Sequence, residues 1–258
     1  MATPPKSKRE HLRRLVAGKN EWDESLSAAA KAKGFRGWHE RGYLPHCDQP
    51  RLTQFITFRL WDSMPESRRG EWEHLLNIAE RSNAPRTAAG ARSIASLDDK
   101  TRVEARRDAA REQRIKLEDY LDRNHGDCFL RDPRIAALME TALRFHHGSR
   151  FDLLAWVVMP NHVHALIKVG DTPLSDIIQN WKSIVAVKAN KLLGRTGDFW
   201  QLDYWDTFMR NEAQKLKAIR YIENNPVKAK LCRAPEAWPF SSARFRDPQT
   251  RELKLPPP

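Results

Sequence analysis

The chain has 258 residues, of which 40% are hydrophobic and 30% are charged. This length fits one large or two small domains, and nine Trp and ten Phe suffice for a core, so a wholly disordered chain is excluded. No run of about 18 apolar residues occurs, so we expect no membrane-spanning helix. The first residues lack the apolar segment of a secretory signal, and the three cysteines form no CxxC pair, which favours a reducing, cytoplasmic setting.

The charge balance indicates a nucleic-acid partner. Lys and Arg total 45 against 33 for Asp and Glu, a formal net charge of +12. A basic surface is attracted to phosphates through counterion release. An acidic membrane surface is the alternative, but no basic amphipathic helix with a clean apolar face stands out.

The first half of the chain combines a basic start with a strand and helical stretches. We expect a basic arm and loop region over 1–50, because Gly and Pro interrupt 34–50. The β-branched and aromatic segment 54–61 predicts a strand, and the apolar spacing of 67–82 predicts a helix. Residues 83–130 are charged and Ala-rich, and we interpret them as a solvated helical insertion rather than a specific binding element.

The second half alternates apolar runs with clear boundary residues. The predicted elements are a helix at 132–148, a β-hairpin at 150–170, a helix at 174–194, a strand or loop at 198–210 and a helix at 211–225. Met159-Pro160-Asn161 forms the hairpin turn, and Gly194 ends the first long helix. Asn211 is a candidate N-cap, and Pro226 predicts that the last helix ends at about Asn225.

This order predicts an α+β fold, an antiparallel sheet with helices on one face, of ferredoxin or RRM character. The domain boundaries we expect are an arm and loop region at 1–50, a catalytic domain at 51–245 that contains the insertion at about 83–130, and a Pro-rich tail at 246–258.

The segment His162-Val163-His164 carries candidate metal ligands. Side chains alternate along a strand, so the two imidazoles share one face while Val163 points to the other. Neutral imidazoles are common metal ligands, but two cannot close a site, so a third ligand must come from elsewhere. The alternative is a pair of exposed strand histidines without function.

The helix KAIRYIENNP offers a phenol and a carboxamide one turn apart. Tyr221 and Asn225 are four residues apart and therefore lie on one helix face. A metal would polarise a phosphodiester oxygen while the phenol attacks phosphorus. Alternatively, Tyr221 is a half-buried core aromatic and Asn225 is a C-terminal helix cap before the proline. Tyr204, in the aromatic segment, is the second choice of nucleophile.

Taken together, WVVMPNHVHALIKV and the later YIENNPVKAKL resemble the HUH single-tyrosine transposase superfamily, and more closely the bacterial REP-associated tyrosine transposases. The segments GWHERGYLPHCDQPRLTQFITFRLWDSMP, FWQLDYWDTFMRNE and WPFSSARF also resemble that family, so the likeness covers about 34–245. The insertion at 83–130 is longer than the family pattern leads us to expect.

The resemblance implies an activity and assigns residues to it. His162 and His164 match the metal-binding histidines, Tyr221 matches the nucleophile, and Asn225 matches the position of the third metal ligand. The implied cofactor is Mg²⁺ or Mn²⁺; since Mg²⁺ prefers oxygen ligands, we expect Mn²⁺ to bind at least as well. The implied enzyme is a single-stranded DNA endonuclease and strand-transferase that acts in DNA transposition through a 5′-phosphotyrosine.

The implied partner is single-stranded DNA with palindromic, REP-type hairpins. We expect a cytoplasmic, nucleoid-associated bacterial protein without membrane contact, and a monomer, with a dimer as the alternative. Basic and aromatic residues of the N-terminal region are candidate DNA contacts. They are Lys6, Lys8, Arg9, Arg13, Arg14, Arg36, Trp38 and Arg41.

Two other functions remain open at this point. The first is a non-catalytic, RRM-like module that binds nucleic acid through a basic, aromatic face. The second is a metal-dependent phosphodiesterase that activates water and forms no covalent link to the protein.

Overall fold

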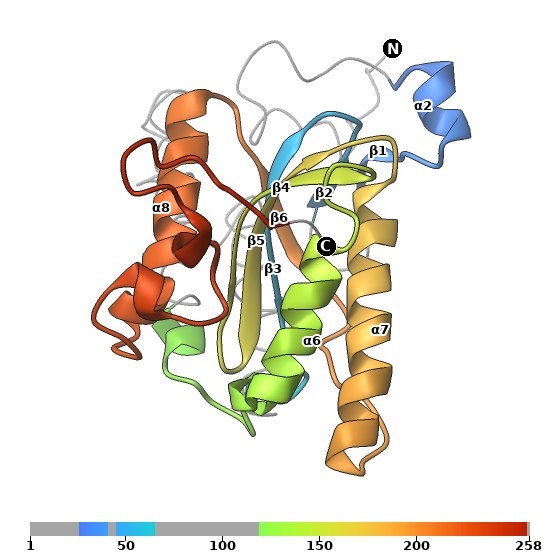
Figure 1. Cartoon of the computed structure of the whole chain (residues 1–258). Helices are drawn as coiled ribbons and strands as arrows, with labels where there is room; N and C mark the ends of the chain where they lie inside the picture. Colours follow the sequence, from blue (N-terminus) through green and yellow to red (C-terminus); the bar gives the residue numbers. More distant parts are fainter. Residues whose placement is uncertain (1–25, 41–44, 65–118, 257–258) are drawn as a thin grey trace, which may run out of the picture.

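The computed structural model describes residues 26–40, 45–64 and 119–256 (Figure 1). The predicted helix at 67–82, most of the insertion at 83–130 and the start of the basic arm lie outside the described residues. Within the described part of the chain, no helix is both long enough and apolar enough to cross a membrane.

A four-stranded antiparallel sheet forms the centre of the described structure, in the order β4-β5-β3-β6. The strands are β3 (Thr53–Arg59), β4 (Phe151–Val158), β5 (His162–Val169) and β6 (Trp205–Phe208). They are rich in β-branched and aromatic residues, which fit a pleated surface. The α+β class, the central strand and the hairpin are therefore confirmed, and the segment at 198–210 contains a strand.

The helices cover both faces of this sheet. Helices α6 (Pro133–Arg144) and α7 (Leu174–Leu193) lie side by side over one face, and α8 (Glu212–Lys228) lies over the other (Figure 1). The prediction that all helices lie on one face is wrong for α8. The central strands are apolar on both sides, so both faces need cover to bury their side chains.

The two apolar clusters show how the strands divide their residues. On the α6 and α7 side, Phe58 packs with Trp181, and Val163 and Ile167 belong to the same cluster. On the α8 side, a smaller cluster forms around Phe55 and Ile222. Because side chains alternate along β5, Val163 faces α6 and α7, and the neighbouring His162 and His164 face α8.

Residues 34–50 are not the continuous loop that Gly and Pro led us to predict. They contain β1 (Gly37–Glu40) and β2 (Pro45–Asp48), which pair as a two-stranded antiparallel sheet. Pro45 is the first residue of its strand, a position where the missing N–H is tolerated. A short helix, α2 (Ala28–Ala32), precedes them, with the Ser27 side chain accepting from the Ala30 backbone N–H.

Helix α8 begins where the sequence predicts, but it ends later. The Asn211 side chain caps its first turn by accepting from the Gln214 backbone N–H at 2.9 Å. Pro226 does not stop the helix, which continues to Lys228. Proline removes one donor, and the Ala229 N–H still bonds to the Asn225 carbonyl at 2.9 Å, so the last turn remains closed.

Candidate active site

Two buried histidines lie on the α8 side of the sheet, next to the hairpin turn. His162 and His164 are both fully buried on β5, and their ring centroids are 4.7 Å apart. The predicted shared face is thus confirmed, and the alternative of exposed strand histidines is excluded. Burying two polar rings is unfavourable unless they are satisfied, so their partners determine what they do.

Each ring is held through its Nδ1 atom. The Nδ1 of His162 lies 2.8 Å from the side-chain oxygen of Asn161, and the Nδ1 of His164 lies 2.8 Å from the hydroxyl of Thr57. The antiparallel register of β3 and β5 places Thr57 directly opposite His164. The Nε2 of His162 is buried and has no hydrogen-bond partner among the described residues.

His162 is a neutral ring at physiological pH. Burial, together with the positive charges of Arg59 and Lys228, lowers its pKa from 6.5 to about 3. A neutral imidazole keeps a lone pair on one nitrogen, which is the form that binds metal ions.

Helix α8 brings the phenol to this histidine pair. Tyr221 is partly buried, and its ring centroid lies 5.5 Å from that of His164 and 5.9 Å from that of Phe55. The neighbouring Ile222 is buried against the strands and fixes the rotation of the helix. The ring of Tyr221 therefore packs against apolar side chains, as a core residue does. It also lies beside the imidazole of His164, as the proposed nucleophile must.

Asn225 lies one turn further along the same helix face. Its side-chain nitrogen donates to the Tyr221 hydroxyl over 3.3 Å. The residue is fully buried, and its side-chain oxygen has no hydrogen-bond partner among the described residues. Asn225 lies within α8, which continues to Lys228 with Ala229 as its C-cap, so the alternative of a C-terminal cap is wrong.

These donors fit a divalent cation that accepts nitrogen and oxygen ligands. They comprise a neutral imidazole nitrogen, a second imidazole and an amide oxygen, with room in the coordination shell for water or a phosphate. Mn²⁺ suits this mixed set better than Mg²⁺ does. No group of three His, Cys, Asp or Glu side chains in the described ranges could hold a metal, so a third ligand of another type is required.

The second choice of nucleophile lies elsewhere. Tyr204 is buried at the start of β6 and packs on the ring of His46 with centroids 4.7 Å apart. Asp206, two residues on, shares the sheet face of Ile56, on the α6 and α7 side. The structure thus places the ring of Tyr221, and not that of Tyr204, against His164.

Sequence reasoning missed a second buried polar cluster, around His46. Its ring bonds to Asp206 through Nδ1, and its Nε2 lies 3.4 Å from Asp203. Burial lowers the pKa of His46, but hydrogen bonds to Asp203 and Asp206 outweigh it and raise the pKa to about 9. The charged ring ties β2 to β6. No local pattern joins position 46 to 203 and 206, so no sequence signal could have found it.

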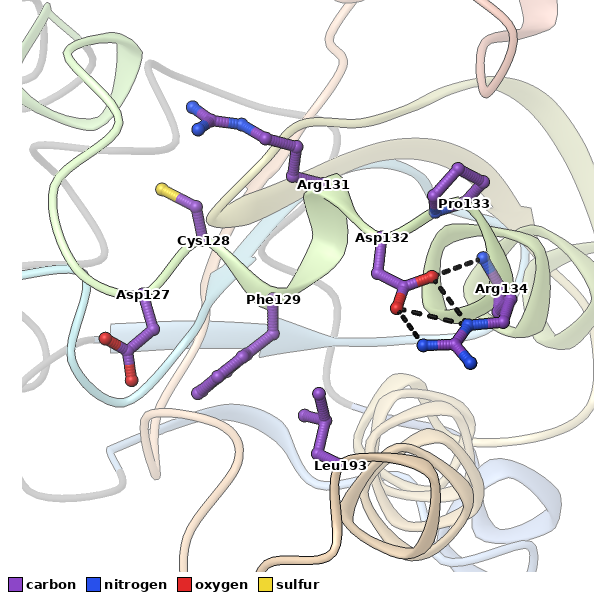
Figure 2. A pocket seen from close by; sticks show the side chains of 8 residues that line it. All are labelled: Asp127, Cys128, Phe129, Arg131, Asp132, Pro133, Arg134 and Leu193. Atoms are coloured by element: carbon purple, nitrogen blue, oxygen red, sulfur yellow. Dashed lines mark hydrogen bonds and ion pairs between the residues drawn. The ribbon is translucent and has the colours of Figure 1, made fainter.

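One pocket of about 590 Å³ lies away from the histidine pair (Figure 2). It lies where the segment before α6 meets the end of α7, and its lining includes Phe129, Arg131 and Leu193. None of the predicted site residues contributes to it. The chemistry-bearing residues are therefore buried beneath α8 rather than gathered in this concavity.

The predicted DNA contacts are mostly outside the described residues. Arg36 is exposed, and its backbone N–H donates to Asp48 at 3.3 Å. Trp38 lies on β1, opposite Cys47. The remaining candidates, in the arm and at position 41, lie in segments that the structure does not describe.

Comparison with known proteins matches the segment that holds the site. The family model described as "Transposase IS200 like" matches residues 127–225, which include both histidines, Tyr221 and Asn225. A REP-associated tyrosine transposase of Escherichia coli (strain K12) is 30% identical over 109 residues, 41% of this chain and 62% of that protein. A putative REP-associated tyrosine transposase of Haemophilus influenzae is 24% identical over 103 residues, 36% of this chain and 58% of that protein.

The matched regions span about six-tenths of the length of these curated relatives. Among solved structures, a REP-associated tyrosine transposase bound to a REP hairpin aligns with a TM-score of 0.44 and 15% identity, over 86% of this chain and 93% of that one.

Proposed function

Because residues 127–225 match the family model described as "Transposase IS200 like", we propose that this chain is a metal-dependent endonuclease and strand-transferase of single-stranded DNA. The observation that carries the proposal is the position of the Tyr221 ring, against buried His164 and hydrogen-bonded to Asn225. The phenol is the nucleophile, and His162, His164 and Asn225 are the metal ligands.

The reaction is a transfer of a phosphodiester from one oxygen to another. The Tyr221 oxygen attacks phosphorus, and the bond from phosphorus to the 3′-oxygen breaks, which leaves a 5′-phosphotyrosine and a free 3′-OH. The phenolic proton is lost and the leaving 3′-oxygen gains one, so charges balance without a nucleotide or a redox partner. A second 3′-OH that attacks the phosphotyrosine reverses the step and joins two strands.

The residues around the phenol support this role. A free tyrosine has a pKa near 10, so its oxygen is a weak nucleophile until its surroundings help. Asn225 donates to the phenolic oxygen and so orients it. When bound, Mg²⁺ or Mn²⁺ would polarise a non-bridging oxygen of the phosphodiester.

The substrate we propose is DNA that folds into palindromic, REP-type hairpins. The names of the curated relatives refer to REP elements, and the net charge of +12 suits a polyanionic partner. We propose that the chain acts as a monomer, with a dimer as the alternative, because the ring of Tyr221 lies against His164 of the same chain.

The test is the capture of a covalent intermediate. A labelled REP-type hairpin oligonucleotide is incubated with the protein and Mn²⁺, and the products are separated under denaturing conditions. We expect an adduct that Tyr221→Phe abolishes and Tyr204→Phe retains. An adduct lost only in Tyr204→Phe would move the nucleophile. Cleavage without an adduct would favour the water-activating phosphodiesterase, and binding without cleavage would favour the non-catalytic module.

A further inference from the structure

The turn between β4 and β5 is held from three sides. The Met159 N–H bonds to the His162 carbonyl at 2.9 Å, the Leu60 N–H bonds to the Asn161 carbonyl at 2.9 Å, and the Leu130 N–H bonds to the Pro160 carbonyl at 3.1 Å. The turn therefore has little freedom, and the side chain of Asn161 is fully buried within it. A buried amide in a fixed turn has a defined direction for each of its two ends.

The direction of the Asn161 amide follows from its partners. Its nitrogen end lies 3.0 Å from the backbone carbonyl of His125, which can only accept a hydrogen bond. The nitrogen must therefore face His125, and the oxygen end must face the Nδ1 of His162, 2.8 Å away. The reverse orientation would place two acceptors against each other.

An amide oxygen accepts only, so the Nδ1 of His162 must carry the proton. In a neutral ring, the lone pair then lies on Nε2, the buried nitrogen that has no hydrogen-bond partner among the described residues. The amide thus selects one of two tautomers, and the selected one presents a ligand nitrogen away from the turn.

The carbonyl that orients Asn161 is itself fixed to the rest of the site. The ring of His125 stacks on Tyr120 with centroids 4.3 Å apart. The same segment contributes Asp119 and Asp122, which pair with Lys228 at 2.7 and 3.0 Å. Lys228 belongs to α8, three residues after Asn225. One segment therefore supports the hairpin turn and holds the helix that bears the phenol.

We propose that Asn161 is a positioning residue that fixes His162 in the tautomer protonated at Nδ1, so that Nε2 binds the divalent cation. The tautomer follows from this chain alone, whereas the consequence for metal binding rests on the proposed function. Partners of a ligating histidine typically change metal affinity by roughly 10- to 100-fold when they are removed.

The first experiment reads the tautomer directly. Long-range ¹H–¹⁵N correlation spectra of the imidazole rings are recorded for the metal-free protein and three variants. We expect the Nδ1-protonated form of His162 in the unchanged chain and in Asn161→Asp, which keeps an acceptor oxygen, and loss of that preference in Asn161→Ala. The control is Asn190→Ala on α7, which removes a side-chain hydrogen bond to the Gly197 carbonyl far from the histidines. An Nε2-protonated ring in the unchanged chain overturns the proposal without any variant.

The second experiment measures Mn²⁺ affinity by electron paramagnetic resonance titration, with thermal melting as the folding check. We expect a roughly 10- to 100-fold weaker Kd in Asn161→Ala, a Kd closer to that of the unchanged chain in Asn161→Asp, and no change in Asn190→Ala. Equal affinity in Asn161→Ala and the unchanged chain overturns the role of Asn161. If the unchanged chain binds no Mn²⁺, the proposed metal site fails while the tautomer result stands.

Discussion

Two buried histidine clusters lie on opposite sides of one sheet, and their histidines differ in charge. His46, between Asp203 and Asp206, is held as a cation, and burial and nearby cations keep His162 neutral. Burial alone would favour the neutral form of both rings, so the charge of each ring depends on its neighbouring groups. Two carboxylates make His46 a structural tie between β2 and β6. The side-chain oxygen of Asn161 accepts a hydrogen bond from the Nδ1 of His162, which leaves a lone pair on its Nε2 for a ligand.

The largest effect we expect is on the structural cluster. His46→Leu leaves the buried Asp206 and the partly buried Asp203 without their cation, and breaking a buried ion pair in this way costs about 3–5 kcal/mol in free energy of unfolding. Urea denaturation at pH 7 measures the loss. The covalent adduct with a hairpin oligonucleotide, scored under conditions where the variant is folded, should still form. A loss below about 1 kcal/mol would show that the His46 cluster does not hold β2 against β6.

The catalytic cluster should respond in the opposite manner. On the proposed mechanism, His164→Ala should lower the rate of hairpin cleavage by more than about 100-fold, because it removes a proposed ligand of the metal that acts on the phosphate. Hairpin affinity, measured by gel shift or anisotropy, should remain largely unchanged. Comparable losses of binding and cleavage would instead mean that His164 acts through folding, as His46 does.

The two clusters should also titrate in opposite directions. The raised pKa of His46 means that its contribution to stability is complete below about pH 6.5 and is lost as the pH rises through about 9. The lowered pKa of His162 means that the unfolded chain binds a proton that the folded chain does not, so stability falls below pH 6.5. At about 1.4 kcal/mol per pH unit, the alkaline loss from pH 6.5 to 9 should amount to about 3 kcal/mol, and the acid loss from pH 6.5 to 5 to about 2 kcal/mol.

Urea denaturation of the metal-free protein from pH 5 to 10 checks both limbs. His46→Gln should weaken the loss of stability above pH 6.5, and His162→Gln should weaken the loss of stability below pH 6.5. A variant that flattens the other limb, or neither, would contradict the assignment of charge to the two rings.

Local patterns predicted which candidate site residues share a face better than they predicted how the helices pack on the sheet. Strand alternation placed His162 and His164 on one face, and helix spacing placed Tyr221 above Asn225, because both are short-range geometric rules. That α8 covers the second face depends on which apolar side chains meet across the sheet. The His46 cluster joins three distant positions, and only the folded chain brings them together.

The choice of nucleophile between Tyr204 and Tyr221 also depends on contacts that the sequence does not predict. Tyr204 and Tyr221 both lie in aromatic surroundings, and the sequence favours the second only through its neighbour Asn225. In the structure, each tyrosine packs on a histidine, but on different ones: Tyr204 on the charged His46, and Tyr221 on His164. The identity of the histidine is a tertiary property, which spacing along the chain does not encode.

The smallest effect we expect separates binding from chemistry. The chain carries a net charge of +12, whereas His162 is neutral, so hairpin affinity should come from surface cations rather than from the histidine pair. Affinity should fall roughly tenfold or more between 50 and 200 mM salt, because bound cations release counterions from DNA. His164→Ala should show the same slope of log affinity against log salt concentration as the unchanged chain. A flat response in the unchanged chain would remove the electrostatic argument for binding, and a smaller slope in His164→Ala alone would mean that the site itself carries charge to the phosphates.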